Sequence, residues 1–227
     1  MIPASADAVP ARFIVFEGGE GCGKSTQATL LATRLDAVLT RQPGGTALGS
    51  ALRRILLGAP DEAGVGGVSD RAEALLMAAD RAQHVAELIR PALASGRHVV
   101  CDRYIGSSVA YQGHGRGLDP ERIRGISDWA VDGLRPDLVV LLQVDPATAG
   151  ARTGSPRDRI EAAGADFHAR VAGGFAAQAA ADPGRWVVVD GSGTVDEVEH
   201  QVATVVRERL GLPVDGGGSG DRSGGRA

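Results

Sequence analysis

Short apolar runs alternate along most of the chain with longer segments whose apolar residues recur every three or four positions. The short runs predict buried strands at 12–17, 37–41, 98–102, 138–144 and 186–190. The longer segments predict helices at 25–35, 47–57, 71–95, 120–133, 164–181 and 195–210, with a short helix after Asp145. Strands that alternate with helices are typical of an α/β fold built on a doubly wound parallel sheet.

Capping signals mark the starts of three of these helices. Asp70 with Glu73 three residues later predicts a capping box that opens the long helix at 71–95. Thr194 with Glu197 predicts a second capping box. Asp119 is followed by a proline, the pairing expected of an N-cap and the first helical position.

Three segments carry no such periodicity. Residues 1–11 are rich in Ala and Pro and predict a flexible N-terminus, and the glycine-containing stretch at 58–69 predicts a surface loop. The Gly/Ser-rich stretch at 211–227 predicts a disordered tail. The remainder, 12–210, has the length of one domain.

Composition narrows the function classes. The net charge of −4 and the pI near 5.7 argue against nucleic acid or a membrane surface as the partner, and leave small anions held by local arginines. No long apolar run or signal-peptide pattern is present, so a cytoplasmic protein is expected. Cys22 and Cys101 form neither a disulfide framework nor a metal-binding spacing, and fit buried thiols in a reducing compartment.

The stretch at 13–27, FIVFEGGEGCGKSTQ, reads as a strand, a glycine-rich turn and the start of a helix. Its glycines and the lysine-serine pair fit the P-loop pattern, in which converging N–H groups and a helix N-terminus hold phosphates. Lys24, the only lysine of the chain, is expected to reach the outer phosphates, and the Ser25 hydroxyl to ligate Mg²⁺. The predicted nucleotide-binding residues are Gly18, Gly19, Glu20, Gly21, Cys22, Gly23, Lys24, Ser25 and Thr26.

Further polar residues stand where predicted strands end. Because the carboxyl ends of parallel strands face one crevice, Gly18, Arg41, Asp102 and Asp145 are expected to surround a single site. Asp102 has the character of an acid that orients Mg²⁺, and its alternative role is a cap of a turn. Arg103 follows Asp102 directly.

Arginines supply the positive charge that phosphoryl transfer needs. Arg103 lies at a strand end, and Arg152, Arg157 and Arg159 cluster in a polar segment that follows the fourth strand and could close over the site. A solvated surface position is the alternative for any one of them. Together with Lys24 they form the predicted catalytic set.

Six segments match a known family. They are FEGGEGCGKST (16–26), TRQPGGT (40–46), ALLMAADRAQH (74–84), CDRYIGSSVAYQGHGRG (101–117), VDP (144–146) and RDRIE (157–161). On these motifs the chain resembles the bacterial thymidylate kinases over roughly 12–205, and the pattern DRY…AYQG…RG is the most specific.

The resemblance implies a P-loop kinase fold with a five-stranded parallel sheet, flanking helices and a mobile arginine-rich lid at about 152–160. It also implies a Mg²⁺-dependent transfer of the γ-phosphoryl group of ATP to dTMP, which gives dTDP for dTTP biosynthesis. The resemblance further implies that the enzyme is a cytoplasmic homodimer. Because the P-loop itself carries no arginine, the chain fits the subtype whose catalytic arginine lies in the lid. The segment at 190–194, DGSGT, falls where the adenine-side loop of the family lies.

The same resemblance implies roles on the acceptor side. Glu20 would approach the sugar of dTMP, and Arg81 and Arg103 would hold its phosphate and neighbouring groups. Ser108, Tyr111 and Gln112 would read the base and deoxyribose. The acceptor-binding set is Glu20, Arg41, Pro43, Met77, Arg81, Arg103, Ser108, Tyr111 and Gln112.

Two positions depart from the family pattern. Gln42 stands where the family usually has glutamate, which removes a carboxylate near the acceptor phosphate. Met77 stands where an aromatic ring usually stacks on thymine; methionine contacts rings well, and plain core packing is its alternative role.

The residues leave two other functions open. One is a kinase for another nucleotide or nucleoside, and the other is a silent nucleotide-binding module.

Overall fold

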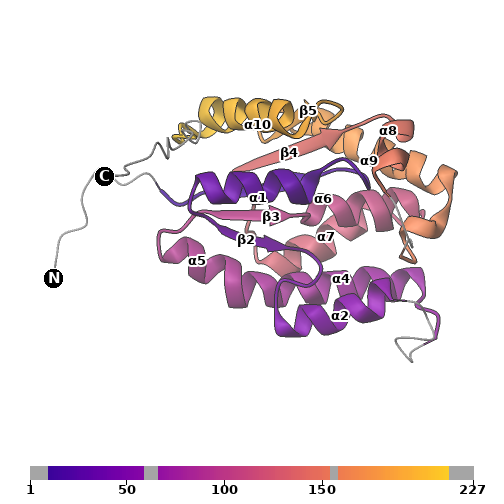
Figure 1. Ribbon diagram of the computed structural model, residues 1–227. Helices are drawn as coiled ribbons and strands as arrows, with labels where there is room; N and C mark the ends of the chain where they lie inside the picture. Colours follow the sequence, from indigo (N-terminus) through magenta and orange to yellow (C-terminus); the bar gives the residue numbers. More distant parts are fainter. Residues whose placement is uncertain (1–9, 59–65, 154–157, 215–227) are drawn as a thin grey trace, which may run out of the picture.

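The computed structural model describes residues 10–58, 66–153 and 158–214, and its centre is a five-stranded sheet with helices on both faces (Figure 1). The strand order is β2-β3-β1-β4-β5, and every neighbouring pair is parallel. The strands are β1 (Phe13–Glu17), β2 (Val38–Arg41), β3 (Val99–Asp102), β4 (Leu138–Gln143) and β5 (Trp186–Asp190). The predicted α/β fold with a five-stranded parallel sheet is confirmed.

The helices follow the predicted alternation. They are α1 (Lys24–Arg34), α2 (Ala47–Leu57), α4 (Asp70–His84), α5 (Arg90–Ala94), α6 (Ile105–Ser108), α7 (Pro120–Val131), α8 (Pro146–Arg152), α9 (Ala165–Ala181) and α10 (Val195–Leu210). Shorter π-helical segments are η1 (Val85–Ile89) and η2 (Val109–Gly115), and η3 (Glu161–Ala163) is a 3₁₀ turn. The capping box of Thr194 and Glu197 and the Asp119 cap are present.

The two faces of the sheet bury separate apolar clusters, because alternate residues of a strand point to opposite sides. Ile14 and Phe16 of β1 pack with α1 and α10, whereas Phe13 and Val15 pack with α4, α5 and α7. A third cluster joins η2 to α9 around Tyr111. Figure 1 shows α1 and α10 on one side of the sheet, and α2, α4, α5 and α7 on the other. The strand ends between these layers are left to form the site.

One predicted helix differs in detail. The segment predicted as one helix at 71–95 is divided into α4, η1 and α5. Its N-cap is Ser69, whose hydroxyl accepts the amide N–H of Ala72, so the predicted cap at Asp70 is wrong by one residue. Glu73 is not a capping residue; its carboxylate is buried. Segments α6 and η2 were not predicted as helical, because their Gly and Ser residues hide the periodicity.

The ordered core reaches beyond the predicted domain end at 210. Leu212 and Val214 are buried in the cluster under α1 and α10, so the first residues of the predicted tail belong to the fold. Residues 1–9, 59–65 and 215–227, which include most of the predicted flexible segments, lie outside the described residues. None of the helices in the described part of the chain has the length and apolar content needed to cross a bilayer.

Candidate active site

The glycine-rich loop between β1 and α1 has a backbone that only glycine adopts easily. Gly18, Gly21 and Gly23 all have positive φ angles, of 143°, 71° and 91°. A Cβ on Gly18 would overlap the carbonyl oxygen of Leu142, and one on Gly21 would lie 2.5 Å from the carbonyl oxygen of Ala149. Around Gly19 and Gly23 there is open space. The loop is therefore tight against β4 and α8 on one side and open on the other, as a phosphate cradle requires.

Lys24 lies inside this loop. Its side chain is almost fully buried, its ammonium donates to the carbonyl of Gly19 at 2.5 Å, and it lies 3.4 Å from the Cys22 thiol. Lys24 is the first residue of α1, so the positive end of that helix and the ammonium are directed at the same place. This arrangement favours an anion at the mouth of the loop.

Ser25, in the first turn of α1, meets Asp102 at the end of β3. The Ser25 hydroxyl donates to Asp102 Oδ2 at 2.5 Å, although the residues are 77 positions apart in sequence. Asp102 Oδ1 is buried and has no hydrogen-bond partner among the described residues. A hydroxyl beside a carboxylate with a free buried oxygen fits a hard cation such as Mg²⁺. The described residues contain no group of three or more acidic, His or Cys side chains that could hold a metal ion, so a cation here would take its other ligands from phosphates and water.

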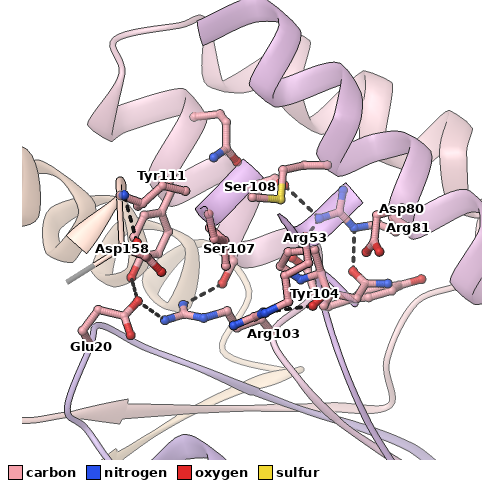
Figure 2. Close-up of a pocket in the computed structure, with 16 residues that line it drawn as sticks. Glu20, Arg53, Asp80, Arg81, Arg103, Tyr104, Ser107, Ser108, Tyr111 and Asp158 are labelled. Atoms are coloured by element: carbon pink, nitrogen blue, oxygen red, sulfur yellow. Dashed lines mark hydrogen bonds and ion pairs between the residues drawn. The ribbon is translucent and has the colours of Figure 1, made fainter. Parts of the chain in front are cut away.

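A second polar cluster lies beside the P-loop (Figure 2). Arg103 pairs with the Glu20 carboxylate and donates to Gly18 O at 3.0 Å and to Ser107 Oγ at 3.1 Å. The Tyr111 hydroxyl donates to Glu20 at 3.0 Å, and the Arg103 guanidinium lies 5.1 Å from the centre of the Tyr111 ring. Burial alone would raise the pKa of Glu20, but the charges of Arg103 and Lys24 outweigh it and lower that pKa to about 2.

Arg103 also has an unusual backbone. Its φ of 71° lies in the left-handed region, which costs a non-glycine residue about 1 kcal/mol. Its amide N–H donates to the carbonyl of Phe16 at 2.9 Å, which fixes this turn against β1. The neighbouring Glu17 carboxylate accepts the amide N–H groups of Tyr104 and Ser107, both at 3.0 Å. The end of β1 therefore holds the Arg103 turn in place.

Arg81, unlike Arg103, is not paired with a carboxylate among the described residues. It is fully buried in α4, and its donors reach only neutral acceptors among the described residues: Gln42 Oε1 at 3.0 Å, Ser108 Oγ at 2.8 Å, Ser127 Oγ and Tyr104 O, both at 3.2 Å. Burial lowers its pKa.

Gln42, one of the two positions that depart from the family pattern, continues this network. Its amide nitrogen lies 2.9 Å from His84 Nδ1, and His84 Nε2 lies 2.7 Å from Thr40 Oγ1. Burial is the main cause that lowers the pKa of His84 to about 4, and the Arg81 charge adds to it. His84 is therefore neutral at neutral pH and can accept from the Gln42 amide, which leaves the Gln42 oxygen for Arg81.

Two cavities meet at these residues. One, of about 270 Å³, lies over the P-loop and includes Lys24, Ser25, Thr26, Arg41 and Asp102. The other, of about 110 Å³, is lined by residues of α4, α6 and η2, among them Met77, Arg81, Ser108, Tyr111 and Gln112. Four residues line both cavities: Glu20, Gln42, Arg53 and Arg103.

The structure thus gathers most of the predicted site residues around one cleft, with the larger cavity at its predicted phosphate end and the smaller cavity at its predicted acceptor end. Pro43 lines the smaller cavity, with its carbonyl accepting from Arg53 at 3.0 Å. Met77 also lines it and packs against the apolar cluster around Tyr111. Asp145 is not gathered there; it caps α8 through the N–H groups of residues 147 and 148.

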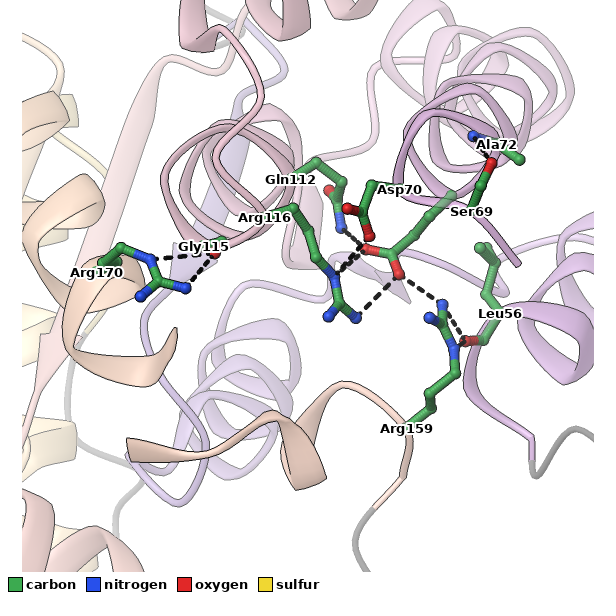
Figure 3. Close-up of polar contacts among 10 residues, drawn as sticks. Leu56, Ser69, Asp70, Ala72, Gln112, Gly115, Arg116, Arg159 and Arg170 are labelled. Carbon is green, nitrogen blue, oxygen red and sulfur yellow. Dashed lines mark hydrogen bonds and ion pairs between the residues drawn. The ribbon is translucent and has the colours of Figure 1, made fainter. Parts of the chain in front are cut away.

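Two of the three predicted lid arginines, Arg152 and Arg159, are described, and they contact different elements. Arg152, at the end of α8, donates to the carbonyls of Gly191, Ser192 and Gly193 at 2.7, 3.1 and 3.2 Å. Arg159 donates to Leu56 O (Figure 3). It also pairs with Glu73 at 2.5 Å. Arg157 lies outside the described residues. Arg152 therefore contacts the loop at 190–194, and Arg159 contacts the acceptor side.

The residues in or behind the cleft that the sequence did not reveal include Arg53 and Glu73. Arg53 lines both cavities from α2, where an argument based on strand ends does not look. Its pairing with Arg54 near the end of a largely apolar helix was the available signal. Glu73 accepts from Gln112, Arg116 and Arg159, and nothing in its local sequence indicates those partners.

Comparisons with known proteins agree with this geometry. The family model described as thymidylate kinase matches residues 16–202. The thymidylate kinase of Leifsonia xyli is 51% identical over 201 residues, covering 85% of this chain and 93% of the relative. The thymidylate kinase of Bifidobacterium longum strain DJO10A is 48% identical over 201 residues, covering 86% of this chain and 97% of the relative. The solved structure of thymidylate kinase from Ehrlichia chaffeensis superposes with a TM-score of 0.72 at 32% identity, covering 87% of this chain and 99% of that one.

Proposed function

Because the chain belongs to the thymidylate kinase family, we propose that it transfers the γ-phosphoryl group of ATP to dTMP, giving dTDP and ADP. The observation that carries this proposal is the junction between the two cavities. The phosphate-binding cavity and the acceptor cavity share Glu20, Gln42, Arg53 and Arg103. A donor phosphate in one and an acceptor phosphate in the other would meet at that junction, as in-line transfer requires.

Each end of the cleft has a distinct task in this reaction. The P-loop glycines and Lys24 would hold the β- and γ-phosphates of ATP, and the loop at 190–194 together with Arg152 would lie on the adenine side. Arg103, Arg53 and Arg41 would receive the acceptor phosphate and the charge that spreads over the transferring group. Glu20 and Tyr111 would face the deoxyribose, and Arg81, Ser108 and Gln112 the base.

Mg²⁺ would be held at Ser25 and Asp102, where the buried Asp102 Oδ1 has no hydrogen-bond partner among the described residues. When bound, such an ion neutralises phosphate charge and orients the phosphates. Ser25 and Asp102 themselves fix where it would lie, because α1 and β3 hold them at hydrogen-bond distance.

Assembly and location follow the family expectation. We propose a cytoplasmic homodimer with one kinase domain per chain and a mobile lid near 152–160. Large apolar side chains are exposed on three neighbouring helices, Leu48 on α2, Leu75 on α4 and Trp129 on α7, which supports burial against a second copy. Cys22 and Cys101 are both free and buried, which supports a reducing compartment.

The test is an ATP-consumption assay with dTMP, dUMP, dCMP and thymidine, each with and without Mg²⁺. We expect dTMP to have the highest kcat/KM and Mg²⁺ to be required. Preferential turnover of thymidine or of another monophosphate would instead favour a different nucleotide or nucleoside kinase. No turnover of any acceptor would favour a silent nucleotide-binding module.

The Lys24→Ala substitution tests the phosphate end. Removing a charge that interacts with the transferring phosphates should lower kcat at least about a hundredfold, near 2.7 kcal/mol of transition-state stabilisation. The KM for dTMP should change much less, because Lys24 does not line the acceptor cavity. Steady-state kinetics and a thermal unfolding control separate this effect from loss of the fold. A loss of turnover below tenfold would contradict the assignment.

A further inference from the structure

The carboxylate of Glu73 joins several parts of the acceptor side. Its partners Gln112, Arg116 and Arg159 are labelled in Figure 3. Glu73 belongs to α4 and has no exposed surface. Gln112 Nε2 donates to it at 2.9 Å, Arg116 Nη2 at 3.1 Å and Arg159 Nη2 at 2.5 Å. These partners come from η2, the turn after it and the segment after α8. One buried side chain therefore connects α4 with three elements of the cleft.

This carboxylate cannot easily rotate. Its Oε1 accepts from Gln112 and, at 3.4 Å, from Arg116 Nε, whereas its Oε2 accepts from Arg116 and Arg159. The Arg116 guanidinium is in turn held 4.9 Å from the centre of the Phe167 ring. Both oxygens are engaged by groups from different elements, so Glu73 presents a fixed acceptor to Gln112.

A fixed acceptor determines how the Gln112 amide is turned. The nitrogen of a glutamine amide only donates and its oxygen only accepts, and an ionised carboxylate only accepts. Burial raises the pKa of Glu73, but the hydrogen bonds from Gln112 and Arg116 and the charges of Arg116 and Arg159 lower it overall, so the carboxylate is ionised at neutral pH. The Gln112 nitrogen must therefore face Glu73, which leaves its oxygen for the cavity. No hydrogen bond to Gln112 Oε1 is found among the described residues.

The opposite kind of group comes from Arg81, which can only donate and lines the same cavity. The acceptor pocket thus offers a donor from α4 and an acceptor from η2. Thymine and uracil carry a carbonyl oxygen beside an N–H group, which complements this pair. Cytosine carries an amino group beside an unprotonated ring nitrogen, which is the reverse pattern and would leave groups unpaired at a cost of about 1–3 kcal/mol each.

We propose that Glu73 is a positioning residue for base selection: by holding the Gln112 amide in one orientation, it makes the acceptor pocket accept thymine or uracil and reject cytosine. This inference rests on the proposed function, since it assumes that a nucleoside monophosphate enters this cavity. It assigns to Glu73 a role that acts through Gln112, without contact to the substrate.

The Glu73→Gln substitution tests the proposal. The new amide can either donate or accept, so it no longer fixes Gln112. The ratio of kcat/KM for dTMP to that for dCMP should fall at least tenfold, chiefly through a higher KM for dTMP, with kcat changed less. Glu199→Gln is the matched control, because Glu199 also pairs with an arginine, Arg34 at 2.7 Å, but lies on α10 on the other face of the sheet. A folded Glu73→Gln protein with an unchanged ratio would overturn the proposal.

A measurement on the unaltered protein does not depend on the variant folding. In protein with ¹⁵N-labelled glutamine side chains, the Gln112 NH₂ signals should move little when dTMP is added, because that group stays on Glu73. The N3 proton of dTMP should become observable as its exchange with water slows. A large shift of the Gln112 signals, showing that the amide turns its nitrogen to the base, would refute the inference. If dTMP is no substrate for the parent, the proposed function fails instead.

Discussion

Glu20 and Glu73 are two carboxylates that hold arginines in different surroundings: Glu20 lines the cleft, whereas Glu73 is buried against Gln112, which lines it. Glu20 pairs with Arg103 at the junction of the two cavities, where 31% of its side chain is exposed. Glu73 pairs with Arg116 and Arg159 and has no exposure at all. The first cluster faces the place where phosphates would meet, whereas the second faces only protein.

The difference indicates that the Glu20 pair can rearrange when a ligand binds, whereas the Glu73 cluster stays rigid. The charge pair of Glu20 and Arg103 is partly exposed and lines both cavities, so an incoming phosphate can compete for Arg103 more easily than for a fully buried arginine. The Glu73 cluster is closed, so breaking it would leave buried charges unpaired, which is strongly unfavourable. We expect Glu20 to matter mainly for turnover, and Glu73 for both the fold and the shape of the acceptor pocket.

The largest effect expected from this contrast is on stability. Glu73→Ala should lower the free energy of unfolding by about 3–5 kcal/mol, because it removes the buried acceptor shared by two arginines. Glu20→Ala should cost clearly less than that, since 31% of the Glu20 side chain is exposed, while it lowers turnover. Urea unfolding of both variants beside the parent measures the two numbers. Equal losses would show that the two clusters do not differ as described.

Acid should affect the two ends of the cleft at different pH. The neutral network on the base side contains His84, whose pKa is lowered from 6.5 to about 4. In the unfolded chain this histidine gains its proton near pH 6.5, but the folded protein does not charge it until about pH 4. Stability should therefore fall as pH drops from 6.5 to 4, by up to about 1.4 kcal/mol per pH unit.

The Glu20 contribution has a lower window. Its pKa is lowered from 4.5 to about 2, so its stabilisation is complete above pH 4.5 and is lost as pH falls toward 2. Thermal unfolding between pH 7 and 2 tests both windows. His84→Gln should reduce the pH dependence of stability between pH 6.5 and 4, and Glu20→Gln should reduce it between pH 4.5 and 2. His200→Gln serves as the control, because His200 is exposed. A His84→Gln protein with the same slope between pH 6.5 and 4 as the parent would contradict the upper assignment.

The sequence predicted one cluster far better than the other. Asp102 and Arg103 stand at the end of an apolar strand, and the parallel topology brings that end beside the P-loop that follows β1, whatever the side chains are. Glu73 has no comparable signal, and its spacing from Asp70 instead indicated a helix cap. Its three partners lie 39 to 86 positions away in sequence, so only the folded chain reveals that it belongs to the cleft.

The pattern of apolar residues also failed to predict helical structure where the backbone is not α-helical. The π-helical segment η2, which carries Tyr111 and Gln112, has neither the apolar period of an α-helix nor a capping signal. Gln112 was identified as a site residue only through the family resemblance, which supplies no contacts. Its orientation toward Glu73 follows from tertiary structure, and so does the base preference inferred from it.

The smallest expected effect concerns Met77, which lines the acceptor cavity and also packs on the apolar cluster around Tyr111. If Met77 contacts the base, Met77→Phe should lower the KM for dTMP about two- to fivefold, because a ring stacks on a base somewhat better than a thioether does. The KM for ATP should stay the same, since Met77 does not line the phosphate cavity. Met77→Leu, which keeps the apolar volume without sulfur or ring, should raise the KM for dTMP. If both variants changed only the thermal stability, Met77 would be a packing residue, and base recognition would rest on Arg81 and Gln112.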